Sequence, residues 1–472
     1  MKTALTFPTP ERTSTDTRRW WALAVLLTGT LLPPLDFFIV NVALPALQAD
    51  LQATSSVAQL VVSVYAAAYA VTLILGGRLG DLYGRKRVFI VGMVGFGAAS
   101  ALCGLAPSAG VLVVGRLLQG VSAAIMAPQS LASIHAIFPA REKTRALSLY
   151  GVTIGLAAVA GQFLGGVLVS TDLLGLGWRA VFLINLPVIV LAVPAALAWV
   201  RESRSEQTAR LDVTGALLLA TGLLTLVVPL IEGRERGWPW WCLGALGLSA
   251  PLLAAFWAHE KRRERANGMP LVLPSLLAPS GLRRSLAATF FFYAIAPFFL
   301  VFAVYEQSGL GHDAMATGLA VLPVGLGFLL GPLCTASVAR RLGPNTAAFG
   351  MSLEVAGLLL SAGLAWCDAP SWLAMPLFLI GLGQGIALPA LVRLNVDQVD
   401  ARWAGLASGL VNATLQISAA LSTAVIGGLY FTLAPDGAAA AQVKAGFSVA
   451  ALAMAASLGL AAALARQPRP AP

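Results

Sequence analysis

One carboxylate and one cation lie inside apolar stretches in the first part of this 472-residue chain. Asp36 is near the middle of the first apolar run, and Arg116 is inside the fourth. A bare charge at the centre of a bilayer costs about 3 kcal/mol or more, so such residues usually serve a function. Burial favours the protonated form of a carboxyl group, whereas a nearby cation favours the charged form. We therefore expect Asp36 to be a proton-coupling residue, with a structural role in helix packing as the alternative.

A cluster of glycines and charges separates the second and third apolar runs. Residues 77–87 read Gly-Arg-Leu-Gly-Asp-Leu-Tyr-Gly-Arg-Lys-Arg, in a chain of which only 11% of residues are charged. Glycines remove side chains where two helix ends must approach closely. Asp81 is a single negative charge within a strongly positive turn. We expect this carboxylate to have a defined partner.

The composition predicts a helical membrane protein that carries these residues. Hydrophobic residues make up 58% of the chain, and the mean hydropathy is +0.81. The apolar stretches are about twenty residues long, which is the length that crosses a hydrocarbon core of about 30 Å. The sequence therefore predicts an all-α integral membrane protein with fourteen spans. Their expected centres are near residues 33, 67, 97, 121, 157, 190, 222, 249, 295, 326, 356, 382, 416 and 454.

The spans divide into blocks of six, two and six. Residues 336–343 repeat the spacing of residues 77–84, with Arg340 in the position of Asp81, so the two six-span blocks look like distant repeats. The expected division is a cytoplasmic tail at 1–19, a six-helix bundle at 20–200, two additional helices with basic linkers at 201–284, a second six-helix bundle at 285–465 and a tail at 466–472.

The net charge of +10 follows the predicted membrane topology and does not point to nucleic acid. Twenty-six of the 31 Lys and Arg residues lie in segments on one side of the predicted spans. By the positive-inside rule this side is cytoplasmic, so both termini are expected in the cytoplasm. The chain is expected to be a multi-pass protein of the plasma membrane, and its low Lys content hints at a bacterial source. The four cations expected outside are Arg179, Arg234, Arg236 and Lys444.

Other kinds of chemistry find no support in the sequence. The four cysteines and three histidines are scattered and have no disulfide or metal-binding spacing. No nucleotide-binding loop, metalloprotease motif or nucleophile constellation is visible. We expect no enzymatic activity, no cofactor and no bound metal.

The segment 77–87 resembles the signature loop of the major facilitator superfamily, Gly-x-Leu-Gly/Ala-Asp-x-x-Gly-Arg-Lys/Arg-x. Three further segments are similar to motifs of its fourteen-spanner drug:proton antiporter branch, namely residues 35–45, 115–120 and 178–187. The resemblance covers almost the whole chain. It implies two six-helix bundles around a central cavity, two extra central helices, and alternating access. It also implies that Arg116 is a proton-coupling residue that modulates the proton affinity of a carboxylate, with a static clamp between helices as the alternative.

The resemblance also implies a role for the signature loop. Asp81 would meet the amino terminus of the thirteenth span, near residues 400–405, because unpaired N–H groups and the helix dipole stabilise a carboxylate there. This contact would act as a latch that holds the cytoplasmic side closed. The latch residues are Gly77, Gly80, Asp81, Gly84, Arg85 and Arg87.

The fifth span carries a modified form of another antiporter motif, Gly-Pro-x-x-Gly-Gly. Gly161, Gly165 and Gly166 are present, and Gln162 replaces the proline. The glycines still allow close helix packing, but the kink that a proline would introduce is no longer expected. Export remains favoured over uptake.

Polar, aromatic and thioether side chains within the spans could line an adaptable substrate cavity. Each of them alone has ordinary packing as its alternative, and Glu354, in the eleventh span, is expected to be structural. The candidate cavity residues are Asn41, Tyr65, Tyr69, Gln119, Met126, Gln129, Phe292, Tyr293, Tyr305, Gln384, Asn412 and Gln416.

The leading hypothesis is a monomeric, proton-coupled exporter of hydrophobic or cationic small molecules, of the drug-efflux type. Its partners would be the small-molecule substrate, protons and the lipid bilayer. A dedicated exporter of one host metabolite or an uptake permease is the alternative within transport. A non-transporting receptor or sensor on the same scaffold is the alternative of another class.

Overall fold

The computed structural model describes most of the chain. The part of the chain that it describes contains 14 helical segments that are long and apolar enough to cross a membrane. Each includes one of the centres expected from the sequence, so the predicted all-α, fourteen-span architecture is confirmed. The described residues, which contain no β-strand, are 18–204, 212–266, 268, 270–367, 369–399, 404–435 and 437–466.

The first six spans form one bundle, whose sixth span combines a short helix and a longer one. The break in this span follows Leu183, and the span as a whole covers residues 177–199. The helices are α1 (Arg18–Leu51), α2 (Ser55–Tyr83), α3 (Arg85–Gly104), α4 (Ala109–Ile137), α5 (Ala140–Ser170), α6 (Ala180–Leu183) and α7 (Asn185–Trp199).

Two extra spans precede the second bundle. The ninth span already begins at Ser280, within the segment that the sequence assigned to the linker ending at 284. The extra spans are α8 (Val213–Glu235) and α9 (Trp240–Arg265). The second bundle consists of α10 (Ser280–Phe292), α11 (Phe298–Val304), α12 (Ala314–Ala320), α13 (Leu322–Leu342), α14 (Thr346–Trp366), α15 (Ala374–Val396), α16 (Ala404–Ser422), α17 (Gly428–Leu433) and α18 (Ala440–Ala465).

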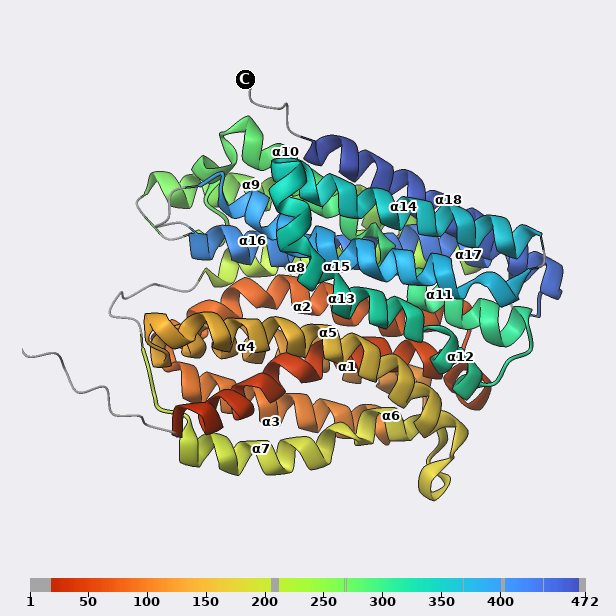
Figure 1. The fold of residues 1–472 in the computed structure, drawn as a ribbon, viewed down its shortest axis with the longest axis horizontal. Helices are drawn as coiled ribbons and strands as arrows, with labels where there is room; N and C mark the ends of the chain where they lie inside the picture. The colour runs from red at the N-terminus through yellow and green to blue at the C-terminus, as the bar shows by residue number, and fades with distance from the viewer. Residues whose placement is uncertain are drawn as a thin grey trace, which may run out of the picture.

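The two bundles lie side by side, with their helices running along the long axis of the molecule (Figure 1). Because the number of spans is even, Arg18 and Ala465 lie at the same end of the bundles, here called the termini end. At the opposite end the bundles are in contact. Gln307 Nε2 donates to the Val42 carbonyl oxygen at 3.1 Å, and Gly166 of α5 packs against α12. The bundles are therefore closed together at the end away from the termini.

Close packing within each bundle depends on glycines. A Cβ atom on Gly76 of α2 would overlap the carbonyl oxygen of Ala124 in α4. In the second bundle, a Cβ on Gly381 of α15 would overlap the carbonyl oxygen of Val324 in α13. Lipid gives helices no hydrophobic reason to associate, so small residues that let backbones touch supply the van der Waals contact instead.

Residues 77–87, here called the signature segment, are mostly helical, which corrects the loop expected from the sequence. Helix α2 continues to Tyr83 and α3 begins at Arg85, so Gly84 alone makes the turn. Its φ of 99° lies in the region that favours glycine. Without a Cβ, glycine adopts this backbone conformation at no steric cost, so one residue is enough to connect the two helices.

Replacing Gly381 with alanine should destabilise the protein, because the added methyl group has no space between α13 and α15. We expect a loss of about 1–3 kcal/mol, the usual cost of overpacking. Gly363→Ala is the matched control, since a Cβ there meets nothing within 4 Å. Thermal unfolding of both variants in detergent tests this prediction, and equal melting temperatures would contradict it.

Candidate functional site

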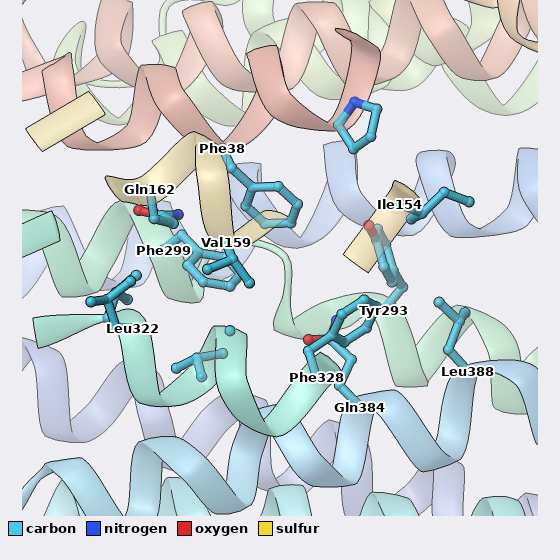
Figure 2. A pocket seen from close by; sticks show the side chains of 14 residues that line it. Phe38, Ile154, Val159, Gln162, Tyr293, Phe299, Leu322, Phe328, Gln384 and Leu388 are labelled. Atoms are coloured by element: carbon cyan, nitrogen blue, oxygen red, sulfur yellow. The ribbon is translucent and has the colours of Figure 1, made fainter. Parts of the chain in front are cut away.

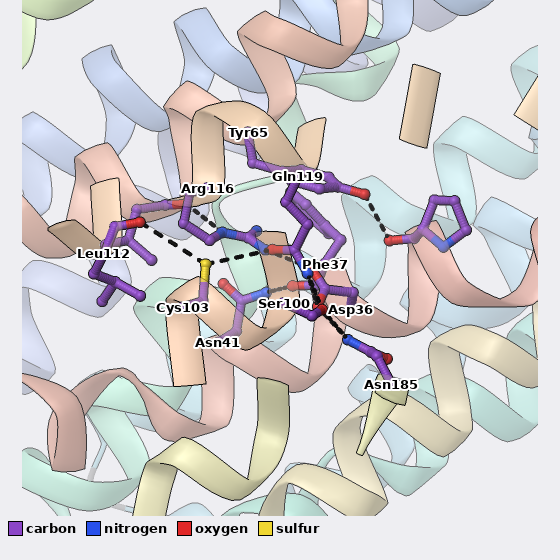
Figure 3. A network of polar contacts seen from close by, with 12 residues as sticks. Asp36, Phe37, Asn41, Tyr65, Ser100, Cys103, Leu112, Arg116, Gln119 and Asn185 are labelled. Carbon is purple, nitrogen blue, oxygen red and sulfur yellow. Dashed lines mark hydrogen bonds and ion pairs between the residues drawn. The ribbon is translucent and has the colours of Figure 1, made fainter. Parts of the chain in front are cut away.

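Asp36 and Arg116 form an ion pair in the first bundle, between α1 and α4 (Figure 3). Arg116 Nη1 donates to Asp36 Oδ2, and both side chains are 0% exposed. The sequence placed both residues inside spans, and the structure brings them into direct contact. A pair this deeply buried has lost its hydration, so it depends on its protein partners.

Two amide side chains complete the surroundings of the carboxylate. Gln119 Nε2 and Asn185 Nδ2 donate to Asp36 Oδ1 at 2.7 and 2.9 Å. The same two nitrogens lie 2.8 and 3.0 Å from Ser100 Oγ. Sequence reasoning selected Gln119 but missed Asn185 and Ser100. Asn185 lies in the motif at 178–187, which could have marked it, whereas nothing in the sequence distinguishes Ser100.

Arg116 is held on its other sides by backbone and aromatic groups. Its Nε donates to the Val61 carbonyl oxygen at 3.0 Å, and its Nη1 donates to Gln119 Oε1 at 2.7 Å. The Tyr65 ring lies 4.2 Å from the guanidinium carbon, a cation–π contact. The Tyr65 hydroxyl in turn donates to the Pro33 carbonyl oxygen at 3.1 Å. Residues of α1, α2, α3, α4 and α7 thus together form this polar centre.

This arrangement can couple a proton to a change of shape. Protonating Asp36 would remove the counter-ion of Arg116 in a low-dielectric site, which is costly unless the guanidinium moves or finds another partner. The reverse holds when the proton leaves. Since neither side chain reaches solvent here, a proton can enter only when the packing around the pair changes.

A cavity lies between the two bundles (Figure 2). It contains about 620 Å³ of empty space, part of which is open to solvent. Its described lining holds three polar side chains, Gln162, Tyr293 and Gln384, and no charged one. The remaining lining residues are Pro34, Phe38, Ile154, Val159, Phe299, Val321, Leu322, Val324, Gly325, Phe328 and Leu388.

The cavity and the ion pair lie on opposite faces of α1. Pro34 and Phe38 are one turn apart and both line the cavity. With about 3.6 residues per turn, Asp36 between them projects from the other side of the helix. The Phe38 ring also packs against Phe299 of the second bundle, with centroids 4.8 Å apart. Helix α1 is therefore a shared wall between the two sites.

Of the residues expected to line a cavity, Tyr293 and Gln384 line this one. Tyr65 and Gln119 belong to the ion-pair network, and Tyr69 lies beside Tyr65, with ring centroids 6.3 Å apart. The reason is that most polar and aromatic side chains in the spans satisfy neighbours within their own bundle. Gln162, which the sequence treated only as a replaced proline, does line the cavity.

The other expected cavity residues lie elsewhere in the two bundles. Met126 packs against Gly92 of α3, and Gln129 Nε2 donates to the Gly76 carbonyl oxygen at 2.7 Å. Asn41 Nδ2 donates to the Phe37 carbonyl oxygen at 2.8 Å. Phe292 is buried in the second bundle, Tyr305 stacks on Phe447 there, Asn412 is exposed on α16 and Gln416 is half-buried on the same helix.

The three antiporter-motif glycines allow α5 to pack closely on two sides. A Cβ on Gly161 or Gly165 would lie 2.7 or 2.8 Å from a carbonyl oxygen of α1. A Cβ on Gly166 would lie 2.7 Å from the carbonyl oxygen of Ala314, in the second bundle. Helix α5 is continuous from Ala140 to Ser170, in keeping with glutamine at position 162.

In the signature segment, Asp81 Oδ1 accepts a hydrogen bond from Arg85 at 3.2 Å. A Cβ on Gly80 would overlap Gln129 of α4, whereas one on Gly77 would have room. Residues 400–403, which include most of the expected latch partner, lie outside the described residues.

A different carboxylate occupies a helix start beside this segment. Glu202 accepts hydrogen bonds from the backbone N–H groups of Lys86 and Arg87 at 3.0 and 3.3 Å, at the amino terminus of α3. A Cβ on Gly84 would lie 2.5 Å from Glu202 Oε1, and Arg87 Nε is 3.8 Å from Oε2 of the same carboxylate. Sequence reasoning missed Glu202, because 116 residues separate it from Lys86.

The Major Facilitator Superfamily model matches residues 26–423. The chain belongs to this superfamily. It is thus a membrane transporter and not an enzyme, and the expected resemblance is confirmed. Among solved structures it is similar to tetrameric PepTSo2, with a TM-score of 0.65 and 14% identity over 95% of this chain and 97% of that one. At this identity, the likeness shows the fold alone.

Curated relatives place it among export and resistance proteins. It is 40% identical to the probable actinorhodin transporter of Streptomyces coelicolor, over 88% of this chain and 73% of that protein. It is 36% identical to the puromycin resistance protein pur8 of Streptomyces alboniger, over 87% and 82%. It is 32% identical to the tetracenomycin C resistance and export protein of Streptomyces glaucescens, over 87% and 76%.

Asp36→Asn should lower the stability of the transporter, because it leaves the buried Arg116 cation without its counter-ion. Removing one partner of a buried pair costs about 3–5 kcal/mol. Replacing both residues, as in Asp36→Asn with Arg116→Met, should cost less than the sum of the single changes. Melting temperatures in detergent provide the measurement.

Asp50→Asn is the control for this prediction. Asp50 pairs with Arg179 at 2.6 Å, but 49% of its side chain is exposed. An exposed pair contributes about 1 kcal/mol or less. If Asp36→Asn proved no more destabilising than Asp50→Asn, the buried pair would not be a structural determinant.

Proposed function

We propose that the protein exports hydrophobic, antibiotic-like small molecules across the plasma membrane of a bacterium in exchange for protons, working as a monomer. The observation that carries this proposal is the buried Asp36–Arg116 pair on the reverse face of the cavity wall. Export as the direction of transport is supported by the resistance and export proteins among the relatives. Drug efflux of this kind was the leading hypothesis from the sequence.

The cavity favours neutral aromatic substrates over cations. Phe38, Phe299 and Phe328 provide flat apolar surface, and Gln162 and Gln384 provide hydrogen bonds. A cation that leaves water is stabilised most strongly by a carboxylate, and the described lining has no charged residue. This narrows the substrate class inferred from the sequence, which included cations.

Alternating access would proceed by rocking of the two bundles. The termini end is taken as cytoplasmic, since it carries the excess of Lys and Arg. The contacts of Gly166 and Gln307 then close the outer side, and the conformation described here is closed to the exterior. Opening that side would separate Phe38 from Phe299 and change the packing of α1 around Asp36. A proton could then reach the carboxylate.

The proton gradient supplies enough energy for this exchange. Moving one charge through 100 mV yields about 2.3 kcal/mol, which corresponds to roughly fifty-fold accumulation per proton. For the opposite conformation, the signature segment remains the proposed latch. Asp81 and Arg85 lie at the turn between α2 and α3, at the termini end.

Asp36→Asn should abolish transport driven by a pH gradient in proteoliposomes, because an asparagine side chain does not take up and release a proton as a carboxyl group does. Substrate counterflow, which needs no net proton movement, should persist and show that the variant is folded. Any wild-type-like response of Asp36→Asn to the pH gradient would exclude Asp36 as the coupling group. Puromycin is a suitable transported probe, given the pur8 relative.

Gln384→Leu should weaken substrate binding about tenfold, since losing one hydrogen bond to a bound ligand costs about 1–1.5 kcal/mol. Gln416→Leu is the matched control, because Gln416 does not line this cavity. Both KM for drug transport and the dependence on the pH gradient should be measured. We expect only KM to change, and only in Gln384→Leu; an equal change in both variants would count against this cavity as the binding site.

A further inference from the structure

A second cluster of buried titratable groups lies at the base of the extra helix pair. Asp212 is the N-cap of α8, and His259, Glu260 and Arg263 lie near the end of α9. Asp212 and Glu260 are 2% and 0% exposed. This cluster is not part of the ion-pair network or of the cavity described above.

One oxygen of each carboxyl group is occupied by donors. Asp212 Oδ1 accepts from the Gly215 N–H at 2.9 Å and lies 2.9 Å from His259 Nε2 and 3.3 Å from Arg263 Nη1. Glu260 Oε2 accepts from the Val272 N–H at 2.8 Å. The hydrogen bond between Val272 and Glu260 holds residues 270–273, which follow α9, against that helix.

The other two oxygens have no donor and face the same point. Asp212 Oδ2 and Glu260 Oε1 are buried and have no hydrogen-bond partner. A Cβ atom built on Gly215 would lie 2.9 Å from the first and 2.5 Å from the second. Two ionised carboxylates so close together, away from water, repel each other strongly, and one shared proton converts the repulsion into a hydrogen bond.

We propose that Asp212 and Glu260 are a second proton-binding site, in which one proton is held between Asp212 Oδ2 and Glu260 Oε1. This proton keeps residues 270–273, which follow α9, docked on the extra helices.

Glu260 is the group that carries the proton. Asp212 lies at a helix amino terminus, where the dipole favours a negative charge, whereas Glu260 lies near a helix carboxyl terminus, where it does not. Burial acts against the charge of Asp212, but the donors from Gly215, His259 and Arg263 outweigh it and hold the pKa of Asp212 below its ordinary value. Asp212, Arg263 and a protonated Glu260 together form a neutral group.

Packing contacts connect this site to α2 of the first bundle. Leu271, next to the anchored Val272, packs with Val71 of α2 and with α8. Helix α2 also contacts α16 of the second bundle. Among the described residues, His259 and Arg263 are the charged or titratable side chains with contacts to the pair, and the α2 surface packed there is apolar. Loss of the proton would place two like charges face to face and loosen the segment.

Infrared spectroscopy of the full-length protein in lipid nanodiscs tests this proposal. The wild type should show a carboxylic-acid C=O band that disappears as the buffer is made alkaline, and Glu260→Gln should lack this component. Glu264→Gln and His259→Gln should retain this band, because they alter neighbours of the Asp212–Glu260 pair (the dyad) and leave its two carboxyl groups intact. An unchanged band in Glu260→Gln would overturn the proposal.

Stability and metal binding provide a second measurement. The melting temperature of the wild type should fall as the dyad loses its proton in alkaline buffer, and Glu260→Gln, which cannot lose one, should lose this pH dependence. A divalent cation is the competing occupant, since the ligand atoms of Asp212, His259 and Glu260 all lie within 4.8 Å of one another. Calorimetric binding of one equivalent of Zn²⁺ or Mn²⁺, abolished by His259→Gln, would replace the proton site by a metal site.

Discussion

The ion pair between Asp36 and Arg116 is the interaction on which the first bundle depends. Two charges without solvent are stable only while each keeps its partners, so the helices that supply those partners are held in register. α1 and α4 carry the charges, and Ser100 and Asn185 bring in α3 and α7. The same requirement makes the pair responsive, because adding a proton to Asp36 changes what every partner must do.

Helix α1 connects this pair to the cavity between the bundles. The two faces of this helix have different surroundings. One packs against the polar centre of the first bundle, and the other, through Pro34 and Phe38, forms a wall of an uncharged cavity. In the proposed exchange, the substrate and the proton therefore need not touch. A change in the protonation of Asp36 that shifts or rotates α1 would alter the cavity and the Phe38–Phe299 contact between the bundles together.

The extra helices have polar chemistry of their own, so they are more than a lipid-facing spacer. Asp212 and Glu260 are separated by 48 positions, and folding brings their unpaired oxygens to one point. The sequence offered no pattern for this dyad, since each residue looks like an ordinary charge at the end of a span. Glu202 was missed for the same reason. Both cases involve contacts between segments that are distant in sequence.

The sequence by itself determined the fourteen spans, the family and the two charges at the centre of the first bundle. Apolar runs of membrane-spanning length and a charge inside such a run are local properties that no tertiary contact can alter. Only the tertiary structure decided which polar side chains face the cavity. Gln162 and Gln384 line it, whereas Gln119 and Gln129 satisfy neighbours within the first bundle. A glutamine in an apolar helix has the same sequence context in either case, and the rotation of the helix against its neighbours determines where its amide finds partners.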